Sequence, residues 1–589
     1  MKKFILLLFL TITSITFSQA DYKLGENYYR EGEYEKAAQI FEKLYSKSPF
    51  NTTYLKRLIS CYQETDQFLE VEKLLKSKLK KNSKQGFLYV LLGYNYDRQQ
   101  LKEQAKKNYA LAIASLDKST SYAPVIGRTF KDYNLLDNAI LTYEKVMAKN
   151  KKANYSFQIA QIYGEKGNFK KMFESYINMI DKNESYFNLV QRYSSKYITD
   201  DSENEANILF RKTLLKKSAS NPKNVWNTLL SWLFTQQKDY RKALIQEKAL
   251  YQRNPTELAA IFSLGRIAFN NKNYNSAKEC FSFISEKTTL KEEKIDAALY
   301  LSKIAIATKD VETEKLFQSL FNEFGKNTST IKLQVEYADF LTFQENKPNE
   351  AKAVLETALT FSNSKFDKAR IKLKLGDILV FTGKYNKALI YFSQIQTKLK
   401  NHELAQQARF KVAQTSYFKA DFTWAKAQLK VLKGSTTQLI ANDAVALFLI
   451  IADNEPVDSI PSGLKQYSKA ALLAFQNKTQ QAIDTLSIIN KDFKGQPIED
   501  EALFKQAKLF IKLKKFKAAI ANFEKVISLN PQGVLIDDAY YELAELHKNH
   551  LNNLEKASEY YQKIIFDYSS SIYLVDARKK YREIRGDDI

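Results

Sequence analysis

The amino-acid sequence predicts an all-α protein, an α-solenoid in which pairs of helices stack along the chain. Three observations predict this fold. Glycine and proline total 16 + 9 = 25 of 589 residues, about a third of average usage, which disfavours a turn-rich sandwich, barrel or propeller. The hydrophobic fraction of 44% and the aromatic fraction of 13% exclude a disordered chain. Residue size also recurs with a period of about 34 residues.

The first repeat is expected to be two short helices joined by a turn. Gly25 and Ala37 are small, as the crossing of two close helices requires. Tyr28 and Phe41 are large and are expected to fill the space between helices. Gly32 would turn the chain, and a proline after the second helix would stop it.

The spacing resembles the tetratricopeptide repeat (TPR) family, whose pattern is Leu-Gly-x-x-Tyr, then Ala-x-x-x-Phe, then Pro. Steps of 34 residues keep the residue size at each position. The Gly25 position becomes Ile59, Gly93 and Gly127, and the Phe41 position becomes Leu75, Tyr109 and Tyr143. Later copies include Gly265 with Phe281 and Gly376 with Phe392. The resemblance implies about fifteen TPR-like helix pairs and a concave groove lined by the first helix of each pair.

Residues 1–20 are predicted to be a secretory signal peptide. Lys2 and Lys3 precede an apolar run over residues 4–12, which is far shorter than the ~20 residues of a membrane span. Small residues then predict a mature N-terminus at Gln19 or Asp21. The alternative is an ordinary first helix. An exported protein in the periplasm or at the outer membrane is therefore expected.

The mature chain is predicted to form two TPR arrays, over residues 21–453 and 464–568. Between them lies a joint over residues 454–463, where Pro456 and Pro461 would interrupt helical stacking.

Residues 569–589 are predicted to be a capping helix and tail. The pattern Tyr-Ser-Ser-Ser-x-Tyr-x-x-x-Ala-Arg over residues 568–578 is similar to the C-terminal repeats of periplasmic TPR proteins of outer-membrane assembly and Tol–Pal systems.

No catalytic constellation is found in the sequence, so we predict a non-enzymatic protein without cofactor or metal. A hidden pair of catalytic carboxylates leaves little sequence trace, so an enzyme stays an alternative. His547 and His550 would share a helical face as a metal-binding or merely surface pair. Cys61 and Cys280 are expected to be packed thiols in distant repeats.

The resemblance also implies which side chains face a ligand, because TPR proteins use fixed offsets of −6, −3, +1 and +4 from the small residue of the first helix. Aromatic residues and arginine are enriched at binding hot spots. The alternative is that these side chains pack between repeats. The predicted partner-binding residues are Tyr29, Tyr94, Arg128, Lys131, Trp232, Phe262, Arg266 and Phe269.

The formal net charge of +24 is spread along the whole chain. Most basic residues are expected on solvated helix faces. We predict a scaffold that binds proteins of unknown identity, without nucleic acid. The alternative is a peripheral binder of anionic envelope surfaces or polyanions, whose affinity would fall steeply with salt.

Ser459 and Thr485 lie in tripeptides that resemble an O-glycosylation motif of exported proteins.

Overall fold

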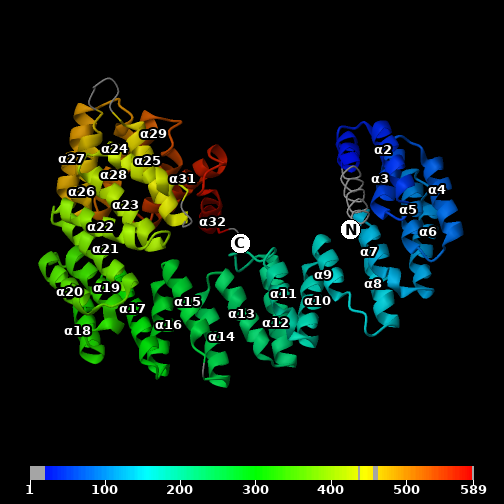
Figure 1. The fold of residues 1–589 in the computed structure, drawn as a ribbon, viewed down its shortest axis with the longest axis horizontal. Helices are drawn as coiled ribbons and strands as arrows, with labels where there is room; N and C mark the ends of the chain where they lie inside the picture. The colour runs from blue at the N-terminus through cyan, green and yellow to red at the C-terminus, as the bar shows by residue number, and fades with distance from the viewer. Residues whose placement is uncertain (1–19, 256, 435–437, 456–461, 587–589) are drawn as a thin grey trace, which may run out of the picture. The chain divides into compact units, whose positions relative to one another are not determined.

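The structure is a computed structural model that describes residues 20–255, 257–434, 438–455 and 462–586. The predicted signal peptide thus lies, except for its last residue, outside the described residues. Within these ranges the regular structure is helical, and the helices follow one another as antiparallel pairs (Figure 1). The predicted α-solenoid of TPR-like helix pairs is therefore confirmed.

The helices group into two compact units, which are described separately. Unit 1 comprises Met1–Ile198 and Glu205–Trp226, and unit 2 comprises Thr199–Asn204 and Asn227–Ile589. In unit 1, a helix over residues 20–30 is followed by α2 (Tyr34–Lys47), α3 (Thr52–Glu64), α4 (Phe68–Lys81), α5 (Gly86–Arg98), α6 (Lys102–Ala114), α7 (Ala123–Asp132), α8 (Leu136–Lys149), α9 (Ser156–Glu165), α10 (Phe169–Lys182), α11 (Phe187–Ser194) and α12 (Glu205–Ser220).

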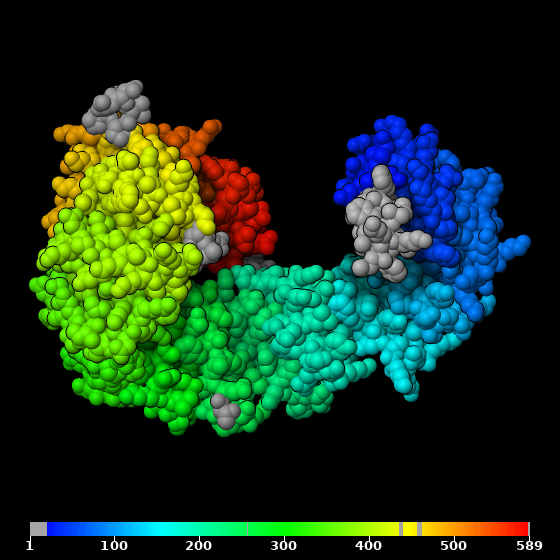
Figure 2. All heavy atoms as spheres, viewed as in Figure 1, coloured from blue at the N-terminus to red at the C-terminus, as the bar shows by residue number. Residues whose placement is uncertain are grey.

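Unit 2 holds the remaining helices, and its atoms form a continuous packed body from the green to the red part of the chain (Figure 2). Its helices are α13 (Asn224–Gln236, which begins at the boundary), α14 (Tyr240–Arg253), α15 (Ala259–Asn270), α16 (Tyr274–Lys287), α17 (Lys291–Thr308), α18 (Thr313–Phe324), α19 (Ile331–Phe343), α20 (Pro348–Phe361), α21 (Lys365–Phe381), α22 (Tyr385–Lys398), α23 (Glu403–Phe418), α24 (Phe422–Leu432), α25 (Gln438–Asp453), α26 (Leu464–Phe475), α27 (Thr479–Asp492), α28 (Ile498–Lys512), α29 (Phe516–Leu529), α30 (Ile536–Asn549), α31 (Leu554–Asp567) and α32 (Leu574–Arg585).

In several repeats a glycine of the first helix faces an aromatic residue of the second helix, as the sequence predicts. A Cβ atom added to Gly93 would lie 2.5 Å from the ring of Tyr109, and one added to Gly127 would lie 2.4 Å from Tyr143. Such distances are far inside van der Waals contact, so the aromatic ring occupies the space that a side chain would need.

Most turns between the two helices of a pair contain a residue with positive φ. In the first four turns this residue recurs every 34 positions, as Gly32, Asp66, Gln100 and Asn134, with φ between 55° and 81°. Left-handed backbone is cheapest for glycine, yet most of these turns use a residue with a side chain. The turn is therefore determined by the packing of the helices as much as by the local sequence.

The predicted joint lies inside unit 2. Its two prolines fall outside the described residues, and α25 packs on α24 on its N-terminal side. Beyond the joint, the ring of Phe475 in α26 packs 5.4 Å from Phe343 and 5.7 Å from Phe418, centroid to centroid. Contacts thus bridge the joint. That it separates two independently stable arrays stays a prediction.

Helix α32 lies at the predicted capping position. The ring of Tyr573 stacks 4.2 Å from Tyr541 of α30, and Ala577 is fully buried. The ammonium group of Lys580 lies 2.7 Å from Glu545 and 2.8 Å from Asp576. Aromatic packing and the ion pair to Glu545 therefore hold this last helix against the stack, while the pair with Asp576 lies within α32 itself.

The two cysteine thiols are free and buried, one in each unit. Burial raises the pKa of both Cys61 and Cys280 to about 12, so neither thiol is a reactive thiolate at neutral pH. Among the described residues, no helix is long and apolar enough to cross a membrane.

Candidate protein-binding groove

The predicted binding residues fall into two sets of four, one in each unit. Tyr29, Tyr94, Arg128 and Lys131 belong to unit 1. Trp232, Phe262, Arg266 and Phe269 belong to unit 2.

In unit 1 the two predicted tyrosines pack against neighbouring first helices. The Arg57 guanidinium lies 5.2 Å from the ring centre of Tyr29, and the ring of Tyr94 lies 4.1 Å from that of Tyr133. Burial raises the pKa of Tyr133 well above its usual value. Each of these tyrosines is half-buried, so one part of the ring packs and the other faces solvent.

Ion pairs link the first helices of unit 1. The Arg57 side chain lies 2.5 Å from Glu26, and Arg98 lies 2.9 Å from Glu64. The predicted Lys131 belongs to the same series, because its ammonium group lies 2.6 Å from the Glu165 carboxylate. Lys131 therefore holds neighbouring repeats together in this structure.

Arg128 and Arg266 are the two predicted residues that stay available for a ligand. Both side chains are exposed, and neither has a carboxylate partner within ion-pair distance among the described residues. A guanidinium group presents five donors in a fixed plane, which suits recognition of carboxylates.

The predicted aromatic residues of unit 2 form part of the packing between repeats. Phe262 and Phe269 of α15 contact Tyr300 of α17, at 5.6 and 5.7 Å between ring centres. Trp232 is half-buried in α13. Packing between repeats is thus observed for the two phenylalanines, and their contact with a ligand stays a prediction.

Unit 2 contains a groove of about 640 Å³ that was not predicted from the sequence. It is lined by α17, α19, α21, α23 and the start of α25, which are first helices of successive repeats. Its apolar lining residues are Leu299, Val335, Leu373, Leu404, Phe410 and Ile440.

Charged side chains of the same groove pair from one first helix to the next. Lys303 of α17 lies 3.4 Å from Glu336 of α19, and Lys411 of α23 lies 3.0 Å from Asp377 of α21. Lys374 of α21 pairs with Asp339 of α19. Each of these ion pairs joins the first helices of two neighbouring repeats.

The pKa of Lys374 is determined by its carboxylate neighbours in this series of ion pairs. Burial lowers the pKa of its ammonium group, but Asp377 and Asp339 outweigh burial and hold the pKa above its usual value. Lys374 therefore stays charged near neutral pH. Because its charge is balanced inside the protein, a ligand in the groove does not have to supply a counter-charge.

The sequence did contain a signal for this groove. Measured from Gly376, the offsets of −6, −3 and +1 are Arg370, Leu373 and Asp377, and all three line the groove. Measured from Ala413, the offsets −6 and −3 are Gln407 and Phe410, which also line it. The residues predicted from the sequence are mainly aromatic and lie in the first half of the chain, so these positions were not among them.

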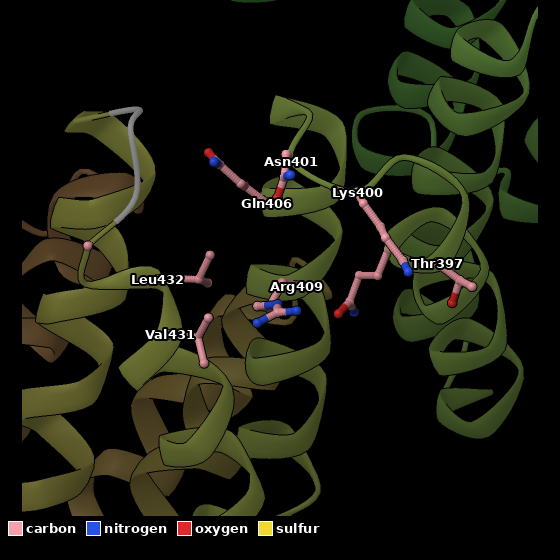
Figure 3. Close-up of a pocket in the computed structure, with 10 residues that line it drawn as sticks. Thr397, Lys400, Asn401, Gln406, Arg409, Val431 and Leu432 are labelled. Carbon is pink, nitrogen blue, oxygen red and sulfur yellow. The ribbon is translucent and has the colours of Figure 1, made fainter.

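A second hollow of unit 2, of about 610 Å³, lies between the end of α22, the start of α23 and α24 (Figure 3). Its lining includes the polar residues Lys400, Asn401, Gln406 and Arg409 beside the apolar Val431 and Leu432. It reaches Gly434, which precedes residues outside the described ranges.

Three smaller predictions can be placed. His550 stacks on Phe516 at 4.6 Å, whereas His547 lies beside Tyr560 at 5.6 Å.

Thr485 is buried in α27, and its hydroxyl donates to the Gln481 carbonyl. That hydroxyl is therefore not accessible for glycosylation in the folded protein. Ser459 lies outside the described residues.

Comparison with protein families finds tetratricopeptide repeats at both ends of the chain, over residues 19–51, 500–532 and 538–571. No curated protein matches the chain by sequence.

Similar solved structures include yeast Tom70, with 13% identity, a TM-score of 0.32 and coverage of 79% of this chain and 99% of that chain. The Cut9–Hcn1 hetero-tetramer of the APC/C has 13% identity, a TM-score of 0.26 and coverage of 90% and 98%. A tetratricopeptide repeat protein from Parabacteroides merdae has 17% identity, a TM-score of 0.24 and coverage of 49% and 99%.

The stacked helix pairs define a helical repeat protein. The matched repeats, together with the glycine and aromatic contacts at several crossings, support a tetratricopeptide repeat protein. Such repeats indicate a protein-interaction scaffold or adaptor.

Proposed function

We propose that this protein is an exported scaffold of the bacterial periplasm or outer membrane, non-catalytic, which holds a segment of a partner protein in the groove of unit 2. The predicted signal peptide supports export. The observation that carries the binding proposal is the groove itself, in which apolar side chains from five first helices lie between internally paired charges.

The physical argument concerns which interactions would produce affinity. An apolar partner side chain that covers Val335, Leu373 and Phe410 removes apolar surface from water, at about 25 cal/mol per Å². The ion pairs at the sides are already formed, so they add selectivity without a large desolvation cost for the partner. The groove therefore suits a segment with spaced apolar residues and few uncompensated charges.

Site-specific photo-crosslinking in intact bacterial cells that produce the protein tests this proposal. A benzophenone amino acid is placed at Gln407 or Asp443, which line the groove. Matched controls carry it at Lys387 or Ile390 of α22, which are exposed but do not line it.

We expect the groove positions to yield one defined adduct in the envelope fraction, which mass spectrometry then identifies. The control positions should not yield that adduct. Equal adducts from both sets, or an adduct only from α22, would overturn the groove as the binding site. Adducts with cytoplasmic proteins alone would overturn export.

A further inference from the structure

In unit 2, most of the turns that join the first to the second helix of a pair carry lysines; the turn between α30 and α31 does not. We call these loops the turn edge. Its lysines are Lys238, Lys272, Lys309, Lys347, Lys384, Lys419, Lys478, Lys514 and Lys515. The first four turns of unit 1 have Gly32, Asp66, Gln100 and Asn134 at the left-handed position, and none of them carries a lysine between its helices. The later turns of unit 1 do carry lysines, Lys166 and Lys196, so the lysines of the turn edge begin before unit 2 and are absent only from the first four turns.

Two stretches of this turn edge meet, although they are distant in sequence. The side-chain amide of Gln476 donates to the Phe381 carbonyl at 2.9 Å, and that of Asn477 donates to the Phe343 carbonyl at 2.5 Å. These partners are 95 and 134 residues apart. The turn after α26 therefore docks against the ends of α19 and α21.

A pocket of about 790 Å³ lies where these turns meet. Its lining comprises Lys309, Phe343, Gln344, Asn346, Phe381, Thr382, Gln476, Asn477, Lys478, Thr479 and Lys512. This lining has three lysines and no carboxylate. Asp310 and Glu345 neighbour it in sequence, but Glu345 lies 3.7 Å from Lys347 and neither lines the pocket.

The lysines are not needed to satisfy the helix ends at this pocket. The terminal carbonyls of Phe343 and Phe381 already accept hydrogen bonds from Asn477 and Gln476. Lys512 donates to Asn477 Oδ1 at 3.0 Å, which orients that amide. Lys309 and Lys478 have no carboxylate partner within ion-pair distance among the described residues.

The second helix α27 adds further positive potential. It begins at Thr479, which lines the pocket, and its N-cap residue Lys478 makes no side-chain capping hydrogen bond. The backbone N–H groups of its first turn are thus left for solvent or a ligand.

We propose that this pocket binds a multiply charged phosphate group. Three lysines that line one cavity without a carboxylate favour a ligand with several negative charges over a single carboxylate. The volume lies within the ~300–1,000 Å³ that small-molecule sites occupy. The ligand can be a soluble polyphosphate or phosphate ester, or the phosphate headgroup of a lipid.

Calorimetric titration of the purified full chain with tripolyphosphate tests the site. The test variant is Lys309→Gln with Lys478→Gln. The matched control is Lys272→Gln with Lys384→Gln, which removes the same charge. Lys272 shares the left-handed turn position of Lys309, and Lys384 shares the N-cap position of Lys478, but neither lines the pocket.

We expect the test variant to bind tripolyphosphate at least 10-fold more weakly than the parent, and the control to change less than 2-fold, with equal helicity and melting of both. Equal loss in both variants would show general electrostatic attraction and overturn the site. Absence of binding by the parent would also overturn it.

Vesicles with and without phosphatidylglycerol distinguish the two sources of phosphate. If a lipid headgroup is the ligand, the parent and the control sediment with the anionic vesicles, the test variant does not, and tripolyphosphate competes. If only soluble phosphate is bound, no vesicle binding depends on Lys309 and Lys478. Vesicle binding that both variants lose equally counts against the pocket.

Discussion

Gly376 faces the ring of Phe392 so closely that a Cβ atom on the glycine would lie 2.3 Å from the nearest ring carbon. The same relationship joins Gly25 to Phe41 and Gly265 to Phe281, each at 2.9 Å. In the second repeat the positions hold Ile59 and Leu75, both fully buried. There the larger first residue accompanies a smaller second one, so the total volume at the crossing is what the fold conserves.

Gly376→Ala should therefore destabilise the protein by about 1–3 kcal/mol, because the added methyl overpacks the crossing. Phe392→Leu should destabilise it through a cavity. We expect the double variant to lose less stability than the sum of both single changes, because the added methyl group at position 376 can occupy the space that the smaller side chain at position 392 leaves empty. Urea unfolding followed by circular dichroism measures all three. Additive losses would contradict the volume argument.

Ala420 has φ of +63° at the turn between α23 and α24. A left-handed backbone costs an L-residue roughly 1–2 kcal/mol, and glycine avoids this cost. Ala420→Gly should therefore stabilise the protein by about 1 kcal/mol. The control is Ala427→Gly at an exposed site inside α24, which should lose about 1 kcal/mol through helix propensity. Thermal melting of both variants checks the opposite signs, and a loss at both sites would refute the interpretation.

The repeat itself was predictable from sequence because its contacts are local. Gly93 and Tyr109 are 16 residues apart, so one helix pair brings them together whatever surrounds it. The left-handed Ala420 was not predictable in this way. Nothing in its neighbours demands positive φ, and only the alignment with the other turns indicates it.

Contacts between distant repeats were beyond the sequence argument. Asn477 meets the Phe343 carbonyl because small rotations between neighbouring repeats add up over several pairs. No single repeat encodes that sum. The unit 2 groove is an intermediate case, since the offset rule does point to Arg370, Leu373 and Phe410, but it does not show which repeats form one continuous hollow.

Glu501 should give the stability of the protein a distinctive pH dependence. Burial, followed by the charge of Asp500, raises its pKa to about 7, while Lys505 partly opposes this shift. The folded state then binds more protons than the unfolded state between about pH 4.5 and 7. Stability from this group is therefore lost as the pH rises through that window.

Glu501→Gln should remove this contribution to the pH dependence of stability. Relative to the parent, the variant should therefore be more stable at pH 8 than at pH 5. The matched control is Glu555→Gln, which changes an exposed carboxylate. Melting temperatures between pH 4.5 and 8.5 check the prediction. If parent and Glu501→Gln show parallel profiles, the shifted carboxyl makes no measurable contribution.

The proposed export can be tested at the N-terminus of the mature protein. The basic pair Lys2-Lys3, the short apolar run and the small residues that follow predict cleavage before Gln19 or Asp21. Mass spectrometry of the native protein from an envelope fraction should find one of these N-termini. As a control, Leu7→Arg interrupts the apolar run and should leave the intact chain in the cytoplasm. Recovery of uncleaved parent protein from the cytoplasm would contradict export.

The first-helix residues outside the unit 2 groove can be compared with surface lysines. Arg128 is exposed in α7 without a carboxylate partner among the described residues, and Trp232 is half-buried in α13. Loss of a hot-spot arginine or aromatic residue typically costs ~2 kcal/mol or more of binding free energy. Loss of a peripheral lysine mainly changes the association rate and its salt dependence.

If these first helices also bind a partner, Arg128→Ala and Trp232→Ala should reduce its recovery in a pull-down, whereas Lys80→Ala with Lys81→Ala should retain it. Circular dichroism confirms equal helicity before each comparison. Salt titration of the same pull-down separates the two kinds of contact, because exposed charges are screened at high ionic strength. If the lysine pair abolishes recovery and both first-helix changes are silent, binding occurs through the basic surface and the concave-face prediction is wrong.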